Sequence, residues 1–446
     1  MNHRERAREF LADREYAKWH DEALWFVRMK RDAAAKSVKE WEDLREAAEK
    51  IKEHTIEHLG FYLREFAKNA SKKGIKVHFA KDAKEHNEIV YSILKKHRVT
   101  KVVKSKSMLT EECELNPFLE SRGIEVTDTD LGERIVQLRG DRPSHIVLPA
   151  IHLKKEQIGK LFEEKLHIEK GNSDPLYLTN EARKDLRDKF LKAQGAITGV
   201  NFAVSETGGI VVCTNEGNAD LGTSLAKVHI ACMGIEKLIP KLKHLGVFTR
   251  LLARNATGQP ITSYTTHFNS PSKDKEMHIV IVDNGRSEIL KNKEHKKALF
   301  CIRCGACMNT CPIYRRSGGH SYSYVIPGPI GSVLANARDL KNNGDLAFAS
   351  TLCGSCTNIC PVKIDLHHQL FSYRKEYVQR GYMGFKKRLS YKTASFILRN
   401  PFFFLASMKG YKAFYPFLSK MNLWGEGRAL PKPAKKSFRE IYKEME

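Results

Sequence analysis

The sequence predicts an α/β protein in which a mostly parallel sheet is followed by a small, helical, cysteine-rich module. Between residues 74 and 290, short β-type runs alternate with amphipathic helical runs, which is the pattern of βαβ units. Between residues 299 and 361, seven of the ten cysteines fall into two closely spaced runs. A length of 446 residues is enough for two or three such domains.

Residues 1–70 are expected to form an N-terminal helical segment. Trp41, Leu44, Ala48 and Ile51 recur at the spacing of one helix face, so this segment should pack on the rest of the chain. The charged start, with no apolar stretch after it, argues against a secretory signal. No run of about 18 apolar residues could cross a bilayer. We therefore expect a cytoplasmic protein that could be peripheral to the inner face of the membrane.

Residues 71–290 are expected to form the α/β domain, with helices and strands in alternation. The strands are expected at residues 75–80, 101–104, 123–126, 145–148, 226–233 and 277–282, with two more joined by a tight Glu-Thr-Gly-Gly turn within 197–212. The helices are expected at residues 83–96, 110–119, 131–138 and 174–194.

Three features of this domain are candidates for ligand binding. Residues 206–209 (Glu-Thr-Gly-Gly) and 215–218 (Asn-Glu-Gly-Asn) are expected at strand ends, where ligands collect in α/β sheets, but ordinary turns explain them equally well. Residues 104–107 (Lys-Ser-Lys-Ser) fit a solvated loop better than an anion site. His152 could accept a hydroxyl proton, although a core or surface histidine is more common. No dinucleotide or Walker A fingerprint is present.

The cysteine runs have the spacing of iron–sulfur ligands, and residues 291–380 are expected to form a ferredoxin-like double 4Fe-4S domain after a lysine-rich hinge. Three thiolates spaced two residues apart can hold one cubane cluster, while the cysteine before a proline reaches the neighbouring cluster. The first cluster is then expected to be held by Cys301, Cys304, Cys307 and Cys360. The second is expected to be held by Cys311, Cys353 and Cys356.

The second cluster lacks one thiolate, because Ser350 stands where the repeat of the motif would place a cysteine. Four outcomes are open: Ser350 supplies an oxygen ligand, another side chain does so, the fourth iron is open, or the site holds a three-iron cluster. Each would change the potential or the reactivity of the cluster.

Other uses of the cysteines fit less well. Structural zinc favours two separated pairs of ligands, and disulfides are rare in a chain of this kind. The remaining cysteines, Cys113, Cys213 and Cys232, lie in apolar sequence and are expected to be small buried side chains.

The formal charge of +24 is consistent with an anionic partner, but no nucleic-acid-binding signature accompanies it, so no nucleic acid is expected. Residues 381–446 form a basic, aromatic C-terminal tail with 14 Lys and Arg against 4 acidic residues, including Trp424 and several phenylalanines. Such a tail can dock on an anionic membrane surface or on a partner subunit. A structural tail that packs back on the protein is the simplest expectation.

Several segments together resemble the lactate utilization protein B family, and the resemblance covers most of the chain. They are residues 128–137 (DTDLGERIVQ) with 143–147 (PSHIV), 204–209 (VSETGG) with 214–218 (TNEGN), the cysteine region with His320, 327–331 (PGPIG) and 352–356 (LCGSC), and 430–434 (LPKPA) with 437–438 (SF).

The resemblance implies a sugar-isomerase/CoA-transferase-like α/β domain and two iron–sulfur clusters on the seven cysteines. It also implies an iron–sulfur subunit of a bacterial L-lactate-oxidising complex with two sister subunits, one rich in cysteine pairs and one a shorter relative of the α/β domain. The electrons would pass to a quinone or another carrier. A redox-sensing or assembly module with a labile cluster is the alternative function.

Overall fold

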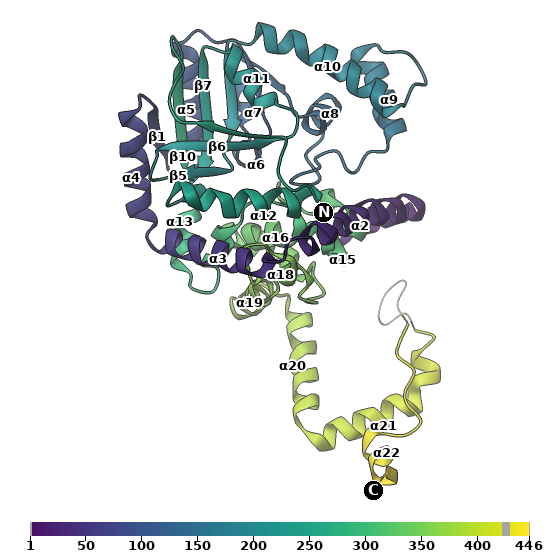
Figure 1. The fold of residues 1–446 in the computed structure, drawn as a ribbon. Coiled ribbons are helices and arrows are strands. Elements are labelled where there is room, and N and C mark those ends of the chain that lie inside the picture. Colours follow the sequence, from purple (N-terminus) through teal and green to yellow (C-terminus); the bar gives the residue numbers. More distant parts are fainter. Residues whose placement is uncertain (1, 422–428, 446) are drawn as a thin grey trace. The chain divides into compact units, whose positions relative to one another are not determined.

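The computed structural model describes residues 2–421 and 429–445. The chain divides into two compact units, Met1–Lys375 and Glu376–Glu446. The first unit contains the sheet, the N-terminal helices and the cysteine-rich module (Figure 1).

A six-stranded parallel sheet forms the centre of the first unit, in the order β1-β10-β7-β4-β2-β3. Its strands are β1 (Lys76–Ala80), β2 (Lys101–Lys104), β3 (Glu125–Asp128), β4 (Gly195–Gly199), β7 (Val228–Gly234) and β10 (Glu276–Val282). The chain runs from β2 outward to β3, whereas β4 lies on the other side of β2 and leads on to β7 and β10. This change of direction opens a crevice beyond the carboxyl ends of β2 and β4, where ligands commonly bind.

The apolar strands are explained by burial of the sheet on both faces. In β7 every residue is buried, and alternate side chains point to opposite sides. Val228 and Ile230 pack with helices α5 and α7, whereas Ala231 and Met233 pack with α4. The connecting helices of this α/β region are α5 (Ala83–Lys96), α6 (Met108–Glu112), α7 (Leu115–Glu120), α8 (Leu131–Arg139), α9 (Lys155–Leu166), α10 (Pro175–Lys192), α11 (Asn218–Leu225), α12 (Leu245–Thr257) and α13 (Arg286–Lys291).

A second sheet of four strands lies beside the first, in the order β8-β5-β6-β9. Its strands are β5 (Phe202–Val204), β6 (Gly209–Thr214), β8 (Leu238–Ile239) and β9 (Tyr264–Phe268). The predicted Glu-Thr-Gly-Gly turn joins β5 to β6. Gly208 has a φ of +67°, and a Cβ there would lie 2.1 Å from the backbone nitrogen of Ala70. Glycine is therefore required because the turn packs directly on α4.

Four helices form the N-terminal segment: α1 (His3–Ala12), α2 (Arg14–Lys36), α3 (Trp41–Glu57) and α4 (Leu59–Lys72). Trp41, Leu44 and Ala48 are buried on one face of α3, as the periodicity predicts. In contrast, the apolar side chains Trp25, Phe26 and Met29 of α2 are about half exposed. Helix α2 packs on the cysteine-rich module through its other face, which carries the buried residues Leu24 and Arg31.

The cysteine-rich module is helical, as predicted. Its helices are α14 (Ala306–Thr310), α15 (Pro312–Ser317), α16 (Gly328–Arg338), α17 (Leu340–Phe348), α18 (Ser355–Ile359) and α19 (Leu366–Gln379). The lysine-rich hinge expected at residues 291–297 is not a free linker, because Lys296 pairs with Glu57 and Lys297 with Glu49 on α3.

The structure corrects two predicted elements. The strand expected at residues 145–148 is wrong: this segment is a loop, because its backbone N–H groups at Val147 and Leu148 bond to the His145 ring instead of a neighbouring strand. The helix expected at residues 110–119 is split into α6 and α7 by Glu114, which has a left-handed backbone conformation.

The second unit contains α20 (Phe385–Arg399), α21 (Pro401–Leu418) and α22 (Phe438–Met445). None of these three helices has a buried residue. The expectation of a tail that packs back on the protein stays a prediction. Trp424 lies outside the described residues. No described helix combines the length and apolar content needed to cross a bilayer.

Candidate metal centre and adjoining cavity

The two cysteine runs fold in the same way. In each run a left-handed glycine, Gly305 or Gly354, begins a short helix that contains the next cysteine. Each helix ends at a cysteine in extended conformation, Cys311 or Cys360, that is followed by proline. The helices, α14 and α18, contact each other, so the structure brings the two runs side by side.

The first group of thiols joins residues from both runs. Burial, and to a smaller extent the nearby Cys301 thiol, raise the pKa of Cys360 to about 11. The pKa of Cys304 is raised by burial and then by Cys360 and Cys301. The pKa of Cys307 is raised by burial and then by Cys301 and Cys304. Cys360 therefore lies with Cys301, Cys304 and Cys307, although it follows the last of them by 53 positions in the sequence.

The second group also crosses between the runs. Burial, and to a smaller extent the nearby Cys311 and Cys353 thiols, raise the pKa of Cys356 to about 12. Cys353 is the only exposed thiol of the seven. Burial raises its pKa, but hydrogen bonds from the Thr351 side chain and the Ser355 backbone outweigh this, so that the pKa is lowered overall.

The spacing of the sulfur atoms fits clusters better than single metal ions. Within the described residues, three potential metal-ligand atoms lie within 4.8 Å of one another at His97, Glu276 and His278. No three cysteine sulfurs of the described residues lie that close together. Four thiolates around one zinc ion would lie about 3.8 Å apart, given Zn–S bonds of about 2.3 Å. Thiolates that each bind a different iron of a cubane lie farther apart. The all-sulfur donor set and its wide spacing therefore fit iron–sulfur clusters.

The N-terminal helices hold the second run in place. The Arg45 guanidinium of α3 donates hydrogen bonds to the backbone oxygens of Asn358 (2.7 Å) and Cys360 (2.9 and 3.1 Å). Arg31 of α2 donates to the oxygen of Ile359 at 3.3 Å. These contacts position Cys360 beside the first run.

Ser350 makes a local contact. Its hydroxyl accepts a hydrogen bond of 3.1 Å from the backbone nitrogen of Leu352, and its backbone oxygen accepts one from Arg374. The four alternatives for the missing ligand of the second cluster stay predictions.

A loop of the α/β domain docks on the first cysteine run. The buried His145 ring accepts hydrogen bonds at Nδ1 from Val147 and Leu148 (3.0 Å each), so its Nε2 donates to Asn309 Oδ1 at 2.9 Å. Burial lowers the pKa of His145 to about 3, which keeps the ring neutral. Gly305 has a φ of +75°, and a Cβ there would lie 2.9 Å from His145 Cε1. The two modules are therefore tightly joined at this loop.

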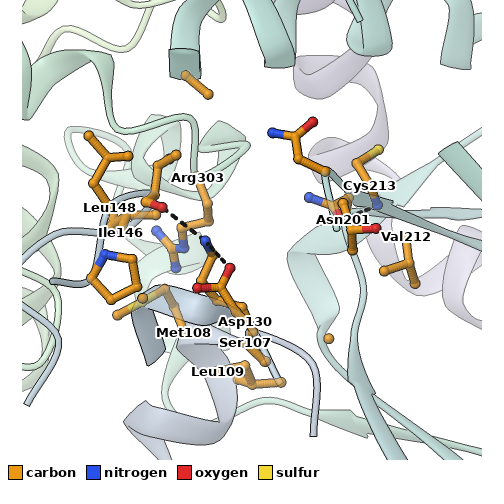
Figure 2. A pocket seen from close by; sticks show the side chains of 18 of the residues that line it. Ser107, Met108, Leu109, Asp130, Ile146, Leu148, Asn201, Val212, Cys213 and Arg303 are labelled. Carbon is orange, nitrogen blue, oxygen red and sulfur yellow. Dashed lines mark hydrogen bonds and ion pairs between the residues drawn. The ribbon is translucent and has the colours of Figure 1, made fainter. Parts of the chain in front are cut away.

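A cavity of about 500 Å³ lies at the predicted crevice, between the carboxyl ends of the strands and the first cysteine run. In Figure 2, Asn201, Val212 and Cys213 stand across the cavity from Arg303 and Asp130. Arg303 lies between Cys301 and Cys304, and its backbone nitrogen donates to Cys301 Sγ at 3.4 Å. The cavity therefore adjoins the first group of thiols.

The cavity lining shows which of the candidate ligand-binding segments and cysteines lie at the cavity. Asn215, Glu216 and Asn218 line it, whereas residues 206–209 form the turn against α4. His152 does not line it and bonds instead to Ser144 Oγ at 2.7 Å. Among the other cysteines, Cys113 and Cys232 are buried as predicted, whereas Cys213 is partly exposed to the cavity.

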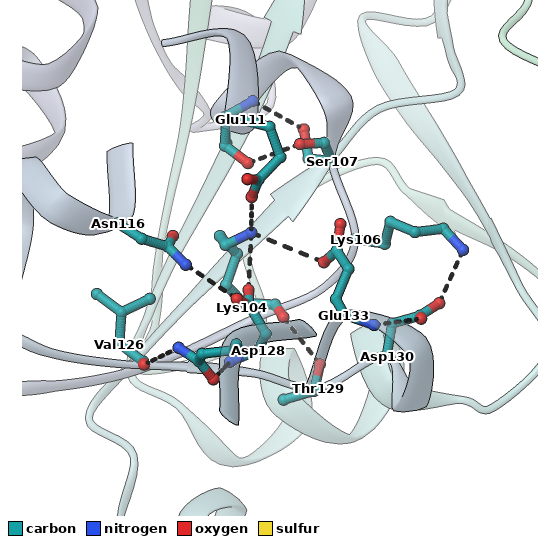
Figure 3. A network of polar contacts seen from close by, with 12 residues as sticks. Lys104, Lys106, Ser107, Glu111, Asn116, Val126, Asp128, Thr129, Asp130 and Glu133 are labelled. Atoms are coloured by element: carbon teal, nitrogen blue, oxygen red, sulfur yellow. Dashed lines mark hydrogen bonds and ion pairs between the residues drawn. The ribbon is translucent and has the colours of Figure 1, made fainter. Parts of the chain in front are cut away.

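The prediction of a solvated loop at residues 104–107 is wrong. The Lys104 ammonium is fully buried and lies 2.7 Å from Asp128, 3.1 Å from Glu111 and 3.7 Å from Glu133 (Figure 3). Burial holds the pKa of Glu133 well above its ordinary value despite the neighbouring cation. Lys106 lines the cavity and bonds to Asp130 at 2.8 Å and to the oxygen of Val147 at 2.9 Å. The sequence could not reveal this, because the acidic partners come from three separate elements.

Comparison with known proteins agrees with the fold and the cysteine geometry. Residues 63–290 match the LUD domain, and residues 297–364 match the 4Fe-4S dicluster domain, which identifies iron–sulfur clusters as the cofactors. The alignment with a solved DUF162 family protein from Deinococcus radiodurans covers 50% of this chain and 98% of that protein, at 11% identity and a TM-score of 0.29.

Relatives of known sequence match over nearly the full length. Lactate utilization protein B of Bacillus cytotoxicus is 44% identical, with 92% of this chain and 90% of the relative covered. The proteins of the same name from Bacillus cereus and Shouchella clausii are each 42% identical, with 92% and 94% of this chain and 90% and 91% of the relatives covered. The chain therefore belongs to the lactate utilization protein B family.

Proposed function

We propose that this chain is the iron–sulfur electron-transfer subunit of a complex that oxidises L-lactate to pyruvate. The observation that supports the proposal is the contact between α14 and α18, which brings the two cysteine runs side by side. Cys301, Cys304, Cys307 and Cys360 would hold the first cluster, and Cys311, Cys353 and Cys356 the second. Clusters of this kind supply one-electron transfer.

The chain's own residues have the supporting roles. Arg31 and Arg45 hold the loop that carries Cys360, and His145 locks the α/β domain onto the first run. Two sister subunits complete the complex, and a quinone or another carrier receives the electrons. The names of the relatives support the link to lactate use.

The proposal predicts the metal content of the purified protein. Anaerobically purified protein should be brown and contain about seven or eight irons per chain, according to whether the second cluster has three or four. Iron and sulfide analysis, with electron paramagnetic resonance of the reduced protein, measures this. A colourless protein that contains zinc would contradict the proposal.

One observation favours a second function, a redox sensor or assembly module with a labile cluster. Cys353 belongs to the three-thiol group and is exposed, so oxidants could reach the second cluster. Deletion of the gene separates the two functions. Lactate oxidation by the sister subunits stops if the chain carries the electrons, and it continues if the chain only senses or assembles.

We expect the C-terminal tail to bind an anionic membrane surface, which is where a quinone carrier would be found. Phe385, Phe402 and Phe417 are 78%, 73% and 66% exposed on helices that also carry many lysines. A chain that ends at residue 380 should keep its iron but no longer sediment with vesicles rich in anionic lipid, because both aromatic insertion and charge attraction are lost. If the full chain does not bind these vesicles either, the tail docks on a partner subunit instead.

A further inference from the structure

The cavity next to the first cysteine run contains two cationic side chains that lack a full set of partners. Among the described residues, the Lys237 ammonium has no hydrogen-bond or ion-pair partner. Arg303 reaches Glu236 only at 3.7 Å, and its Nη1 is buried without any hydrogen bond. Both side chains line the cavity, and their charges repel each other. Such a pair is stabilised by an anion placed between them.

The nearby acids cannot supply that anion. Glu236 forms an ion pair with Arg286 at 2.7 Å, and Glu112 accepts a hydrogen bond from the same guanidinium at 2.9 Å. The Lys52 ammonium is buried close by and bonds to backbone oxygens of Glu236 and Leu238. Four cations, Lys52, Lys237, Arg286 and Arg303, therefore share two carboxylates. The part of the wall around Lys237 and Arg303 therefore has an excess of positive charge, whereas elsewhere in the lining Lys106 stands with the acids Asp130 and Glu216.

The thiolates of the first cluster could account for part of this excess, since Cys301 attracts both Lys237 and Arg303. However, cations that only balanced a cluster would not need to face an open space of about 500 Å³. The space lies at the switch point of the sheet, where α/β proteins bind ligands.

The remaining lining residues indicate which kind of anion would fit the cavity. Asn201 and Asn218 offer amide groups, and apolar side chains such as Ile146, Leu148 and Leu252 complete the lining. A small ligand would match this lining if its charged group met the cations, a neighbouring polar group met the amides, and a short carbon chain met the apolar side chains. Arginine and lysine together bind a carboxylate well, since arginine presents a planar fork and lysine a point charge.

We propose that Lys237 and Arg303 form a carboxylate-binding site in this cavity, and that its ligand is a short-chain 2-hydroxy or 2-oxo carboxylate. The inference rests on the proposed function and deepens it, because it assigns substrate binding to this chain rather than to a sister subunit. The ligand is held beside the loop that carries Cys301 and Cys304, so the site and the first cluster share Arg303.

Isothermal titration of the anaerobic holoprotein with L-lactate and with pyruvate tests the site. One equivalent should bind at millimolar or lower concentration, and propionate, which lacks the 2-oxygen, should bind more weakly. The substitutions Lys237→Gln and Arg303→Gln should each lower the affinity about tenfold or more, because a charge-assisted hydrogen bond is lost. Lys243→Gln is the matched control, since Lys243 lies six residues further along the chain, is exposed and does not line the cavity.

The iron content and the paramagnetic spectrum of each variant report separately on the clusters. If the wild-type holoprotein binds neither acid, or binds propionate as tightly as lactate, the site is wrong while electron transfer stands. If Lys237→Gln alters the spectrum of the first cluster and leaves the affinity unchanged, Lys237 only balances the cluster charge and the site is again wrong. If the protein contains no clusters, the proposed function fails whether or not lactate binds. Lys237→Gln keeps the test valid if Arg303→Gln does not fold.

Discussion

Replacing Cys360 by alanine is expected to remove the first cluster and to leave the second, although Cys360 belongs to the second run. The reason is the crossed arrangement of the thiols, in which Cys360 lies with Cys301 and Cys304. Because a cubane without one of its four thiolates is labile, we expect a loss of about half of the iron. Iron analysis and paramagnetic resonance of the reduced variant measure this.

Matched variants make the expectation specific. The spectrum that remains in Cys360→Ala should equal that of Cys301→Ala, whereas Cys311→Ala should give the spectrum of Cys353→Ala. Uncrossed runs would give the opposite pairing, with Cys360→Ala equal to Cys353→Ala. In that case the ligand sets proposed above would be wrong, even if the iron content of the native protein agreed.

Replacing Lys104 by methionine is expected to destabilise the α/β domain by about 3–5 kcal/mol, the usual cost of breaking a buried ionic network. The side chains of Asp128 and Glu133 are only 6% and 3% exposed, so their carboxylates would be left in the interior without a cation. The free energy of unfolding is measured by denaturant titration or by hydrogen exchange of the sheet amides.

The control for this variant is Lys106→Met, two residues further along the same segment. Lys106 is 27% exposed and pairs with one carboxylate, Asp130, so its loss should cost less. The defect of Lys104→Met should grow as the pH rises, because the buried Glu133 carboxyl already has a raised pKa and the folded state keeps its proton longer than the unfolded state. An equal loss in both variants, or a loss that does not depend on pH, would show that the carboxylates are not the cause.

Local patterns predicted most of the central sheet and its helices. The helix expected at residues 83–96 and the strand expected at 101–104 have those bounds in α5 and β2. These segments have a clear period and capping residues of their own, such as Asp82, which accepts a hydrogen bond from the Glu85 nitrogen. The strand expected at 145–148 failed, because an apolar run has the same pattern in a strand as in a loop that packs on another module.

The candidate sites were predictable to different extents. The seven cysteines follow from their spacing, since ligands close in sequence must lie close in space. The cavity does not follow from the sequence, because its wall joins Lys106 after β2, Asn201 after β4, Lys237 after β7 and Arg303 from the cysteine run. No pattern within any one of these segments marks it as part of a site.

The sequence by itself determined that this protein carries thiolate-bound iron–sulfur clusters next to an α/β domain, because motif spacing and periodicity act over a few residues. Only the tertiary structure decided that the two modules share a cavity, with Lys237 and Arg303 in its wall, and that Lys104 is a buried ion-pair centre. Burial and charge balance depend on side chains that folding brings together from distant parts of the chain, and one-dimensional patterns do not contain that information.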